Sequence, residues 1–147
     1  MKKEILNHTK IQFPSVSVNE SFARAAASAF VSQADPTVRE LSEIKTAVSE
    51  AVTNAIVHGY RDTVGNVEMT MRLSSDNTLY ITIKDKGCGI ENIEQAMTPL
   101  FTTAADEERS GLGFSVMESF MDKLRVKSSR GKGTTVTMQK QLSRRGK

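Results

Sequence analysis

The sequence is poor in the features that mark secreted, membrane-spanning and fibrous proteins. Its single cysteine, Cys88, cannot form a disulfide within the chain, which suits a reducing compartment such as the cytoplasm. No run approaches the roughly 20 consecutive apolar residues that a transmembrane helix requires, and residues 1–8 lack the apolar stretch of a signal peptide. Low-complexity tracts and internal repeats are also absent. We therefore expect a soluble cytoplasmic protein with no membrane partner.

What is present is the composition of an ordinary folded domain. The 147 residues are 38% hydrophobic and 25% charged, which is enough for one domain, residues 1–147, with a buried core. The formal net charge is only +3, and much of it comes from residues 144–147, a short tail of a kind that is usually solvated. This small excess does not favour nucleic-acid recognition, so we expect no direct DNA binding.

Apolar residues recur at helix and strand periods along most of the chain. The pattern predicts a strand over 10–14, a helix that Asn19 caps and whose apolar face holds Phe22, Ala26, Phe30 and the intervening alanines, and a second helix from Pro36 to about Val57. The later elements are a hairpin of strands 69–73 and 79–83, a helix over 111–121, and strands over 124–129 and 134–141. This order predicts an α/β two-layer sandwich, in which a mostly antiparallel mixed sheet carries helices on one face.

Residues 92–110 interrupt the regular pattern. They hold one weak helical turn, a Thr98–Thr103 stretch and the charged residues 106–109. A loop of this length is uncommon in a compact domain unless it is functional, so we predict a lid over a binding site.

Glu50 and Asn54 are the first candidate site residues. They lie four residues apart on the second predicted helix, so both side chains leave from one face. Read alone, such a pair could simply face solvent, but the same row continues to His58 beside the apolar row and therefore borders the core. A carboxamide oxygen is a hard ligand suited to Mg²⁺, and a nearby glutamate can orient or deprotonate an attacking hydroxyl or water. We assign His58 a structural role at the end of the helix.

Asp85, Gly87 and Gly89 form the second candidate group, directly after a predicted strand. An aspartate here can accept a hydrogen bond from a ligand amine, while glycines let the backbone approach closely because they lack a Cβ. Aspartate and glycine also cluster in ordinary turns after strands, so the pattern alone leaves both interpretations open.

Three further signals are compatible with an anion. Gly111, Leu112 and Gly113 open a predicted helix, where free N–H groups can meet a phosphate, although glycines also merely loosen a loop. Arg109 precedes that helix and could contact a γ-phosphate, or could be solvated. Thr134 follows a Gly-Lys-Gly turn and could donate to a base nitrogen or simply favour a strand. Taken together, the order and spacing of these residues indicate such a site more specifically than any one of the signals does.

Taken in order, these residues resemble the GHKL ATP-binding family, which includes gyrase, Hsp90, histidine kinases and MutL. Glu50-xxx-Asn54 resembles the N box, Asp85-x-Gly87-x-Gly89 the first glycine box, Gly111-Leu112-Gly113 the second, and Gly131-x-Gly133-Thr134 the last. The stretches 19–24, 43–46, 49–60 and 109–114 are similar to the anti-sigma-factor serine kinases, above all to their sporulation branch, and together they extend the resemblance over nearly the whole chain.

The resemblance implies an ATP- and Mg²⁺-dependent kinase of the Bergerat fold. Such a protein would phosphorylate a serine of an anti-anti-sigma protein and, with ATP bound, would hold a sigma-F-type sporulation sigma factor as a homodimer. By the same resemblance, Glu50 would be the general base, Arg109 would contact the γ-phosphate and Arg24 would lie on the partner-binding surface. The expected nucleotide-binding residues are Asn54, which also binds the metal, Asp85, Gly87, Gly89, Gly111, Leu112, Gly113 and Thr134.

Two alternatives stay open on the sequence. One is a kinase of the general stress-response branch, with the same chemistry and another sigma factor. The other is a catalytically silent, ATP-gated module that only binds a sigma factor. Sensor histidine kinases are disfavoured because no helical pair bearing a phospho-acceptor histidine precedes Glu50, and gyrase, Hsp90 and MutL types need further domains that 147 residues cannot hold.

Overall fold

The computed structural model describes residues 4–60, 63–88, 113–129 and 131–143. Its elements are β1 (Ile5–Pro14), α1 (Asn19–Ser32), α2 (Val38–Thr53), the π-helix η1 (Asn54–Gly59), β2 (Asn66–Ser74), β3 (Thr78–Asp85), α4 (Gly113–Phe120), β4 (Lys123–Ser129) and β5 (Gly133–Gln141). The predicted order of strands and helices is confirmed, with the first strand starting at Ile5 rather than at residue 10. The predicted lid, residues 92–110, lies outside the described residues.

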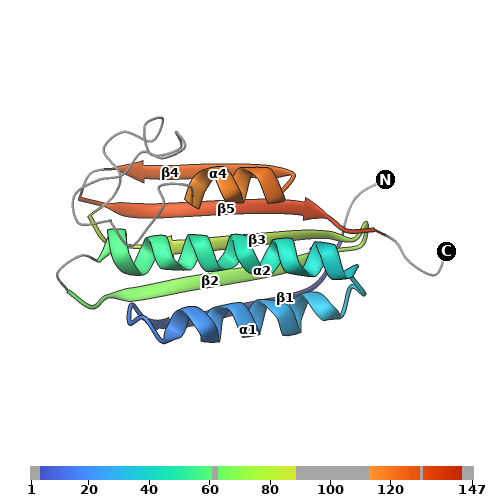
Figure 1. The fold of residues 1–147 in the computed structure, drawn as a ribbon, viewed down its shortest axis with the longest axis horizontal. Coiled ribbons are helices and arrows are strands. Elements are labelled where there is room, and N and C mark those ends of the chain that lie inside the picture. The colour runs from blue at the N-terminus through green and yellow to red at the C-terminus, as the bar shows by residue number, and fades with distance from the viewer. Residues whose placement is uncertain (1–3, 61–62, 89–112, 130, 144–147) are drawn as a thin grey trace.

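The strands form one sheet in the order β1-β2-β3-β5-β4. Each neighbouring pair of these strands is antiparallel. The helices α1, α2 and α4 lie on one face of the sheet, so the predicted two-layer sandwich is confirmed (Figure 1). Among the described residues, no helix combines the length and the apolar character needed to span a membrane.

The core lies between the sheet and α2. The predicted apolar stripe of α2 is buried at Ile44, Val48 and Val52, which pack on the buried side of the sheet. On α1 the predicted apolar face is confirmed except at one residue. The intervening alanines Ala23 and Ala27 are fully buried, and Ala26 and Phe30 are partly buried against the core, whereas the Phe22 side chain is 50% exposed. Small side chains let α1 approach its neighbours closely, and a phenylalanine fits only at the rim of that contact.

The helix starts also differ from the prediction. Asn19 does not cap α1; its side-chain amide donates to the Pro14 carbonyl at 2.9 Å. The second helix begins at Val38, not at Pro36, because Thr37 forms a capping box with Glu40. The Thr37 hydroxyl accepts the Glu40 N–H at 3.0 Å, and the Glu40 carboxylate accepts the Thr37 N–H at 2.8 Å. Two backbone N–H groups that have no partner within the helix are satisfied at once, which fixes the start of the helix.

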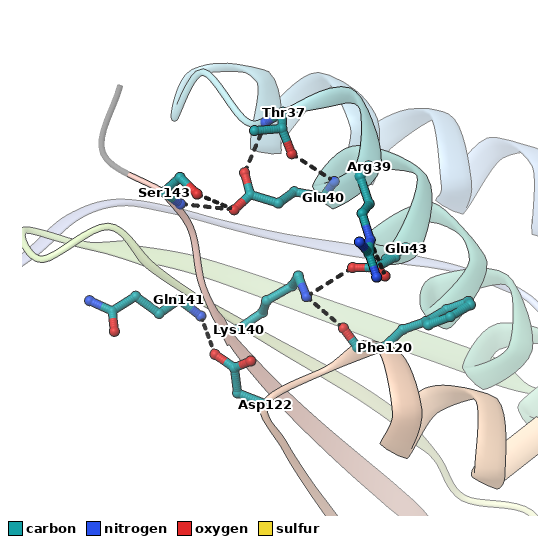
Figure 2. A network of polar contacts seen from close by, with 9 residues as sticks. All are labelled: Thr37, Arg39, Glu40, Glu43, Phe120, Asp122, Lys140, Gln141 and Ser143. Atoms are coloured by element: carbon teal, nitrogen blue, oxygen red, sulfur yellow. Dashed lines mark hydrogen bonds and ion pairs between the residues drawn. The ribbon is translucent and has the colours of Figure 1, made fainter. Parts of the chain in front are cut away.

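A polar network fastens α2 and α4 to the end of β5 (Figure 2). The Glu40 carboxylate accepts the N–H and the hydroxyl of Ser143, each at 2.9 Å. Lys140 Nζ lies 3.2 Å from Glu43 Oε1 and donates to the carbonyl of Phe120, the last residue of α4, at 2.7 Å. The network therefore holds the C-terminal end of α4 against α2.

The two carboxylates of this network have pKa values below the ordinary value of glutamate, so they stay ionised to a lower pH. Burial raises the pKa of Glu40, but hydrogen bonds from Thr37 and Ser143 outweigh it and lower that pKa overall. Burial likewise raises the pKa of Glu43, and the hydrogen bonds and charges of Lys140 and Arg39 lower it overall. Both groups therefore favour folding in their charged form.

Candidate functional site

The junction of α2 and η1 places the first two candidate residues. The Asn54 N–H donates to the Glu50 carbonyl, so the step from Glu50 to Asn54 is still α-helical. Their side chains therefore leave one turn apart from one face, as predicted, and both residues are half-buried. From Asn54 onward the helix widens to the i→i+5 pattern, a rare form that is frequent at functional sites.

The wider π-helix was not predicted and changes the place of His58. In a regular α-helix His58 would continue the row of Glu50 and Asn54, but the i→i+5 spacing moves it off that row. Its backbone carbonyl accepts the Cys88 thiol at 3.0 Å. This contact does not involve the imidazole, so the structural role of the His58 side chain stays a prediction.

The end of η1 is fastened to the turn that follows β3. The Cys88 N–H donates to the Gly59 carbonyl at 2.8 Å. Gly87 packs so closely that a Cβ there would lie 1.8 Å from the same carbonyl oxygen. Only glycine fits this approach, so the two motifs that lie about thirty residues apart in the sequence form one backbone-bonded unit.

Asp85, the last residue of β3, lies at the centre of this unit and is 4% exposed. Its Oδ1 accepts the Gly87 N–H at 2.9 Å. Burial raises the pKa of Asp85, and the backbone N–H groups of Gly87 and Thr134 offset part of that rise. A carboxylate has about four acceptor positions, so two remain for a ligand donor.

Thr134 lies opposite Asp85 in the β3–β5 pairing and is also buried. Its hydroxyl is 2.8 Å from that of Ser128 on β4, so Asp85, Thr134 and Ser128 form a row across three strand ends. Gly133 has a φ of +93°, and a Cβ there would lie 2.2 Å from the Asp85 carbonyl oxygen. The last glycine motif thus packs against the first one.

Sequence reasoning missed Tyr60, which braces the Asp85 turn from outside. Its hydroxyl accepts the Lys86 N–H at 2.7 Å and donates to the Asn66 carbonyl at 2.9 Å. A Cβ at Gly65 would lie 2.2 Å from the Tyr60 ring, so the ring packs directly on that glycine backbone. No local signal marks these partners, because they are brought together only by the fold.

The remaining candidates divide into three groups. Gly113 is the first residue of α4, whose Phe114 and Met117 are buried. Arg24 is not one of the residues around Asp85: it lies on α1, 3.5 Å from Glu20, and lines a hollow of about 520 Å³ between α1 and α2. The candidates outside the described residues are Gly89, Arg109, Gly111 and Leu112.

This geometry suits a nucleotide better than a protein-built metal site. The described residues contain no group of three or more His, Cys, Asp or Glu side chains that could hold a metal ion. Asn54 therefore offers one hard oxygen ligand, and a Mg²⁺ ion there would take its other ligands from phosphate and water. Asp85 offers a buried acceptor of the kind that a base amine needs.

Comparison with known proteins agrees with this site. The family described as "Histidine kinase-like ATPase domain" matches residues 15–140. The chain is 53% identical over 139 residues to an "Anti-sigma F factor" of Bacillus licheniformis, and 52% identical over 136 residues to one of Clostridium novyi. These alignments cover 94% and 92% of this chain and 94% and 95% of the relatives. The chain belongs to the anti-sigma F factor family of histidine kinase-like ATPases.

Two solved structures share the fold of this chain. The RsbU and RsbW domains of a Mycobacterium tuberculosis protein align with a TM-score of 0.70 at 21% identity, over 94% of this chain and 33% of that chain. The histidine kinase domain of the Erythrobacter litoralis blue-light activated histidine kinase aligns with a TM-score of 0.54 at 26% identity, over 71% of this chain and 46% of that chain. The anti-sigma F family member described here therefore has the ATPase fold that its N box and glycine motifs indicated.

Proposed function

We propose that the chain is a Mg²⁺- and ATP-dependent serine protein kinase that phosphorylates an anti-anti-sigma factor and, with ATP bound, sequesters a sporulation sigma factor of the sigma-F type. The observation that carries the proposal is the hydrogen bond from the Asn54 N–H to the Glu50 carbonyl. It sets a potential base and a metal ligand one turn apart, on a helix whose end is bonded to the Asp85 turn. The 53% sequence identity to a protein named "Anti-sigma F factor" supports the choice of partners.

The residues around Asp85 would bind the adenine end of ATP. Asp85 has acceptor capacity left for the adenine amine, and Gly87 and Gly89 would let the backbone lie close to the base. Thr134, bonded to Ser128 and paired with Asp85, would support the same end. A hydrogen bond to a buried charged acceptor contributes about 1.5–3 kcal/mol, which is enough to select adenine over bases without that amine.

The phosphates and Mg²⁺ would lie toward α4 and Asn54. Gly111, Leu112 and Gly113 would offer N–H groups at the start of α4, and Arg109 would contact the γ-phosphate. Asn54 would bind Mg²⁺, which supplies charge neutralisation at the phosphates when bound. We include residues 92–110 in the proposal as a lid that γ-phosphate orders, which would link the nucleotide state to partner affinity. Equal protease sensitivity of that segment with ATP and with ADP would contradict this part.

Glu50 would act as the general base. As the substrate serine oxygen attacks the γ-phosphorus, its proton would pass to the Glu50 carboxylate, the new O–P bond would form, and the bond to the β-phosphate oxygen would break to release ADP. A positioned base contributes about 10²- to 10⁴-fold to such a step. A module that only clamps a sigma factor needs no base at this position.

The surface for protein partners would include Arg24. Its side chain is 43% exposed and lines the hollow between α1 and α2 together with hydroxyl side chains and Lys45 of α2. A cation at the rim of a hollow suits an acidic side chain of a partner. We further propose that the protein works in the cytoplasm as a homodimer, like the kinases that it resembles.

Two substitutions test the division of roles. Glu50→Ala should abolish transfer from γ-labelled ATP to the anti-anti-sigma protein while ATP and sigma-factor binding stay unchanged. Asn54→Ala should instead weaken ATP binding in magnesium. If Glu50→Ala transferred phosphate at the normal rate, the silent-module function would be favoured instead. Offering the sporulation and the stress-response anti-anti-sigma proteins side by side tells the two branches apart, because only the cognate protein becomes labelled.

A further inference from the structure

A tyrosine side chain takes the place of a backbone hydrogen bond where β2 and β3 stop pairing. Val67 of β2 lies opposite Asp85, the last residue of β3. One residue further, Asn66 and Lys86 would form the next pair of the ladder. Instead, the Tyr60 hydroxyl accepts the Lys86 N–H at 2.7 Å and donates to the Asn66 carbonyl at 2.9 Å. One phenol oxygen therefore bridges the two strand ends.

The Tyr60 ring is held in place independently of this bridge. Tyr60 directly follows η1, and a Cβ added to Gly65 would lie 2.2 Å from its ring, so the ring packs on that glycine backbone. The Gly65 backbone is in turn bonded to Ser15. The Ser15 N–H donates to the Gly65 carbonyl at 2.8 Å, and the Ser15 hydroxyl accepts the Gly65 N–H at 2.9 Å. The phenol is therefore positioned by packing on a backbone that has its own partners.

The bridge fixes one end of the peptide group that follows Asp85. The Lys86 N–H is the end that Tyr60 holds. The other end, the Asp85 carbonyl, packs on Gly133, where a Cβ would lie 2.2 Å from its oxygen. The next N–H along the chain, that of Gly87, donates to Asp85 Oδ1 at 2.9 Å. The direction of the Asp85 carboxylate therefore depends on a turn that Tyr60 and Gly133 hold from its two sides.

We propose that Tyr60 is a positioning residue for adenine recognition. Its hydroxyl ends the β2–β3 ladder at Asp85 and keeps the carboxylate directed at the base. This inference rests on the proposed function, in which Asp85 accepts the adenine amine. Without the hydroxyl, the Lys86 N–H loses its acceptor and the turn is held only from the Gly133 side. The bond from the amine to Asp85 then weakens, because hydrogen bonds lose strength steeply as they bend.

A purely structural role of Tyr60 predicts a different result. If Tyr60 only stabilised the fold, its loss would weaken the binding of every nucleotide alike, because the folded site would be populated less often. A role at the Asp85 turn acts instead on the one contact that needs the adenine amine. The ratio of affinities for a nucleotide with the amine and for one without it therefore separates the two roles.

The test is isothermal titration of the full chain with ATP and with purine riboside 5′-triphosphate, which lacks the 6-amino group, both in magnesium. The unaltered protein should prefer ATP by about 10- to 100-fold. Tyr60→Phe keeps the ring on Gly65 and should reduce that preference about three- to tenfold, which is the usual effect of one net hydrogen bond. Tyr80→Phe is the matched control, because it removes the hydroxyl of the other tyrosine, on the same strand as Asp85 but opposite Arg72. The control should leave the preference unchanged.

The possible outcomes separate this inference from the proposed function. If Tyr60→Phe lowered both affinities alike and kept the preference for ATP, the inference would be wrong and the kinase proposal would stand. If the unaltered protein bound neither triphosphate, the proposed function would fail and the inference with it.

Hydrogen exchange without nucleotide tests the bridge itself. The Lys86 amide should exchange faster in Tyr60→Phe than in Tyr80→Phe or in the unaltered protein, because only Tyr60→Phe removes its acceptor. Equal exchange in all three proteins would overturn the inference. Thermal unfolding of each variant checks that it is folded.

Discussion

Gly87→Ala tests whether the glycine turn and the π-helix form one unit. The added Cβ would lie 1.8 Å from the Gly59 carbonyl oxygen, whereas ordinary contact begins at 3.4 Å. The two backbones would have to separate by about 1.6 Å, which breaks the 2.8 Å hydrogen bond from Cys88 to Gly59. Overpacking costs about 1–3 kcal/mol and the hydrogen bond about 1 kcal/mol more, so we expect a loss of about 2–4 kcal/mol.

The effect should be visible in both stability and nucleotide binding. For a domain of this size the expected loss lowers the thermal midpoint by about 5–15 °C. Movement of Gly87 also withdraws the N–H that holds Asp85 Oδ1, so ATP affinity should fall about 10- to 100-fold. Calorimetry of unfolding and isothermal titration with ATP measure the two effects separately.

Gly131→Ala is the matched control. A Cβ at Gly131 meets no atom within 4 Å, so the substitution brings no clash. Its φ of +78° still makes alanine strained, at a cost of about 1–2 kcal/mol. The control should therefore lower the midpoint only modestly. Because the Gly131 N–H donates to the Cys88 carbonyl at 2.6 Å, ATP affinity can fall slightly, but by much less than in Gly87→Ala. A Gly87→Ala protein that behaves like the control would refute the contact between the turn and η1.

Three further predictions follow from the charges. Asp85→Asn should weaken ATP binding about tenfold or more but cost no stability at neutral pH. Because the pKa of Asp85 is raised, its contribution to the unfolding free energy is complete below about pH 4 and lost as pH rises. Urea unfolding of the variant at several pH values should therefore lack this decrease in stability. Lys140→Met should lower the unfolding free energy by about 1.5–3 kcal/mol, because the Phe120 carbonyl loses its charged hydrogen-bond donor. Arg39→Met removes only an exposed ion pair with Glu43 and should cost about 0.3–0.5 kcal/mol. Glu40→Gln should make the unfolding free energy depend less on pH in acid. The pKa of Glu40 is lowered, so its stabilising contribution is present above pH 4.5 and lost as pH falls below it. An equal loss of unfolding free energy on acidification in the variant and the unaltered protein would contradict this.

The sequence predicted the elements whose signals are local. The stripe through Ile44, Val48 and Val52 has a clear helical period, and Met69, Met71 and Leu73 alternate as a strand does. The predicted spacing of Glu50 and Asn54 was confirmed because the helix stays α-helical for that one turn. Residues with a strong periodic context are thus read correctly from the chain alone.

Errors occurred where two local signals competed or where partners came from far away. Asn19 and Thr37 are both good caps by residue type, but only Thr37 has Glu40 three residues later to complete a box. The π-helix has no period of its own in six residues, and its contacts with Cys88 come from about thirty residues away. The burial of Asp85 and the role of Tyr60 likewise depend on neighbours that only the folded chain supplies.

The π-helix also constrains how the site can respond to a ligand. Because the carbonyls of His58 and Gly59 accept hydrogen bonds from Cys88, the helix end that carries Asn54 and the turn that follows Asp85 form one hydrogen-bonded body. Hydrogen exchange should therefore find that the amides of Cys88 and Asn54 open together, with a single free energy, with or without nucleotide. If nucleotide state sets partner affinity as proposed, we expect the change to lie in parts of the chain that are not bonded into this body.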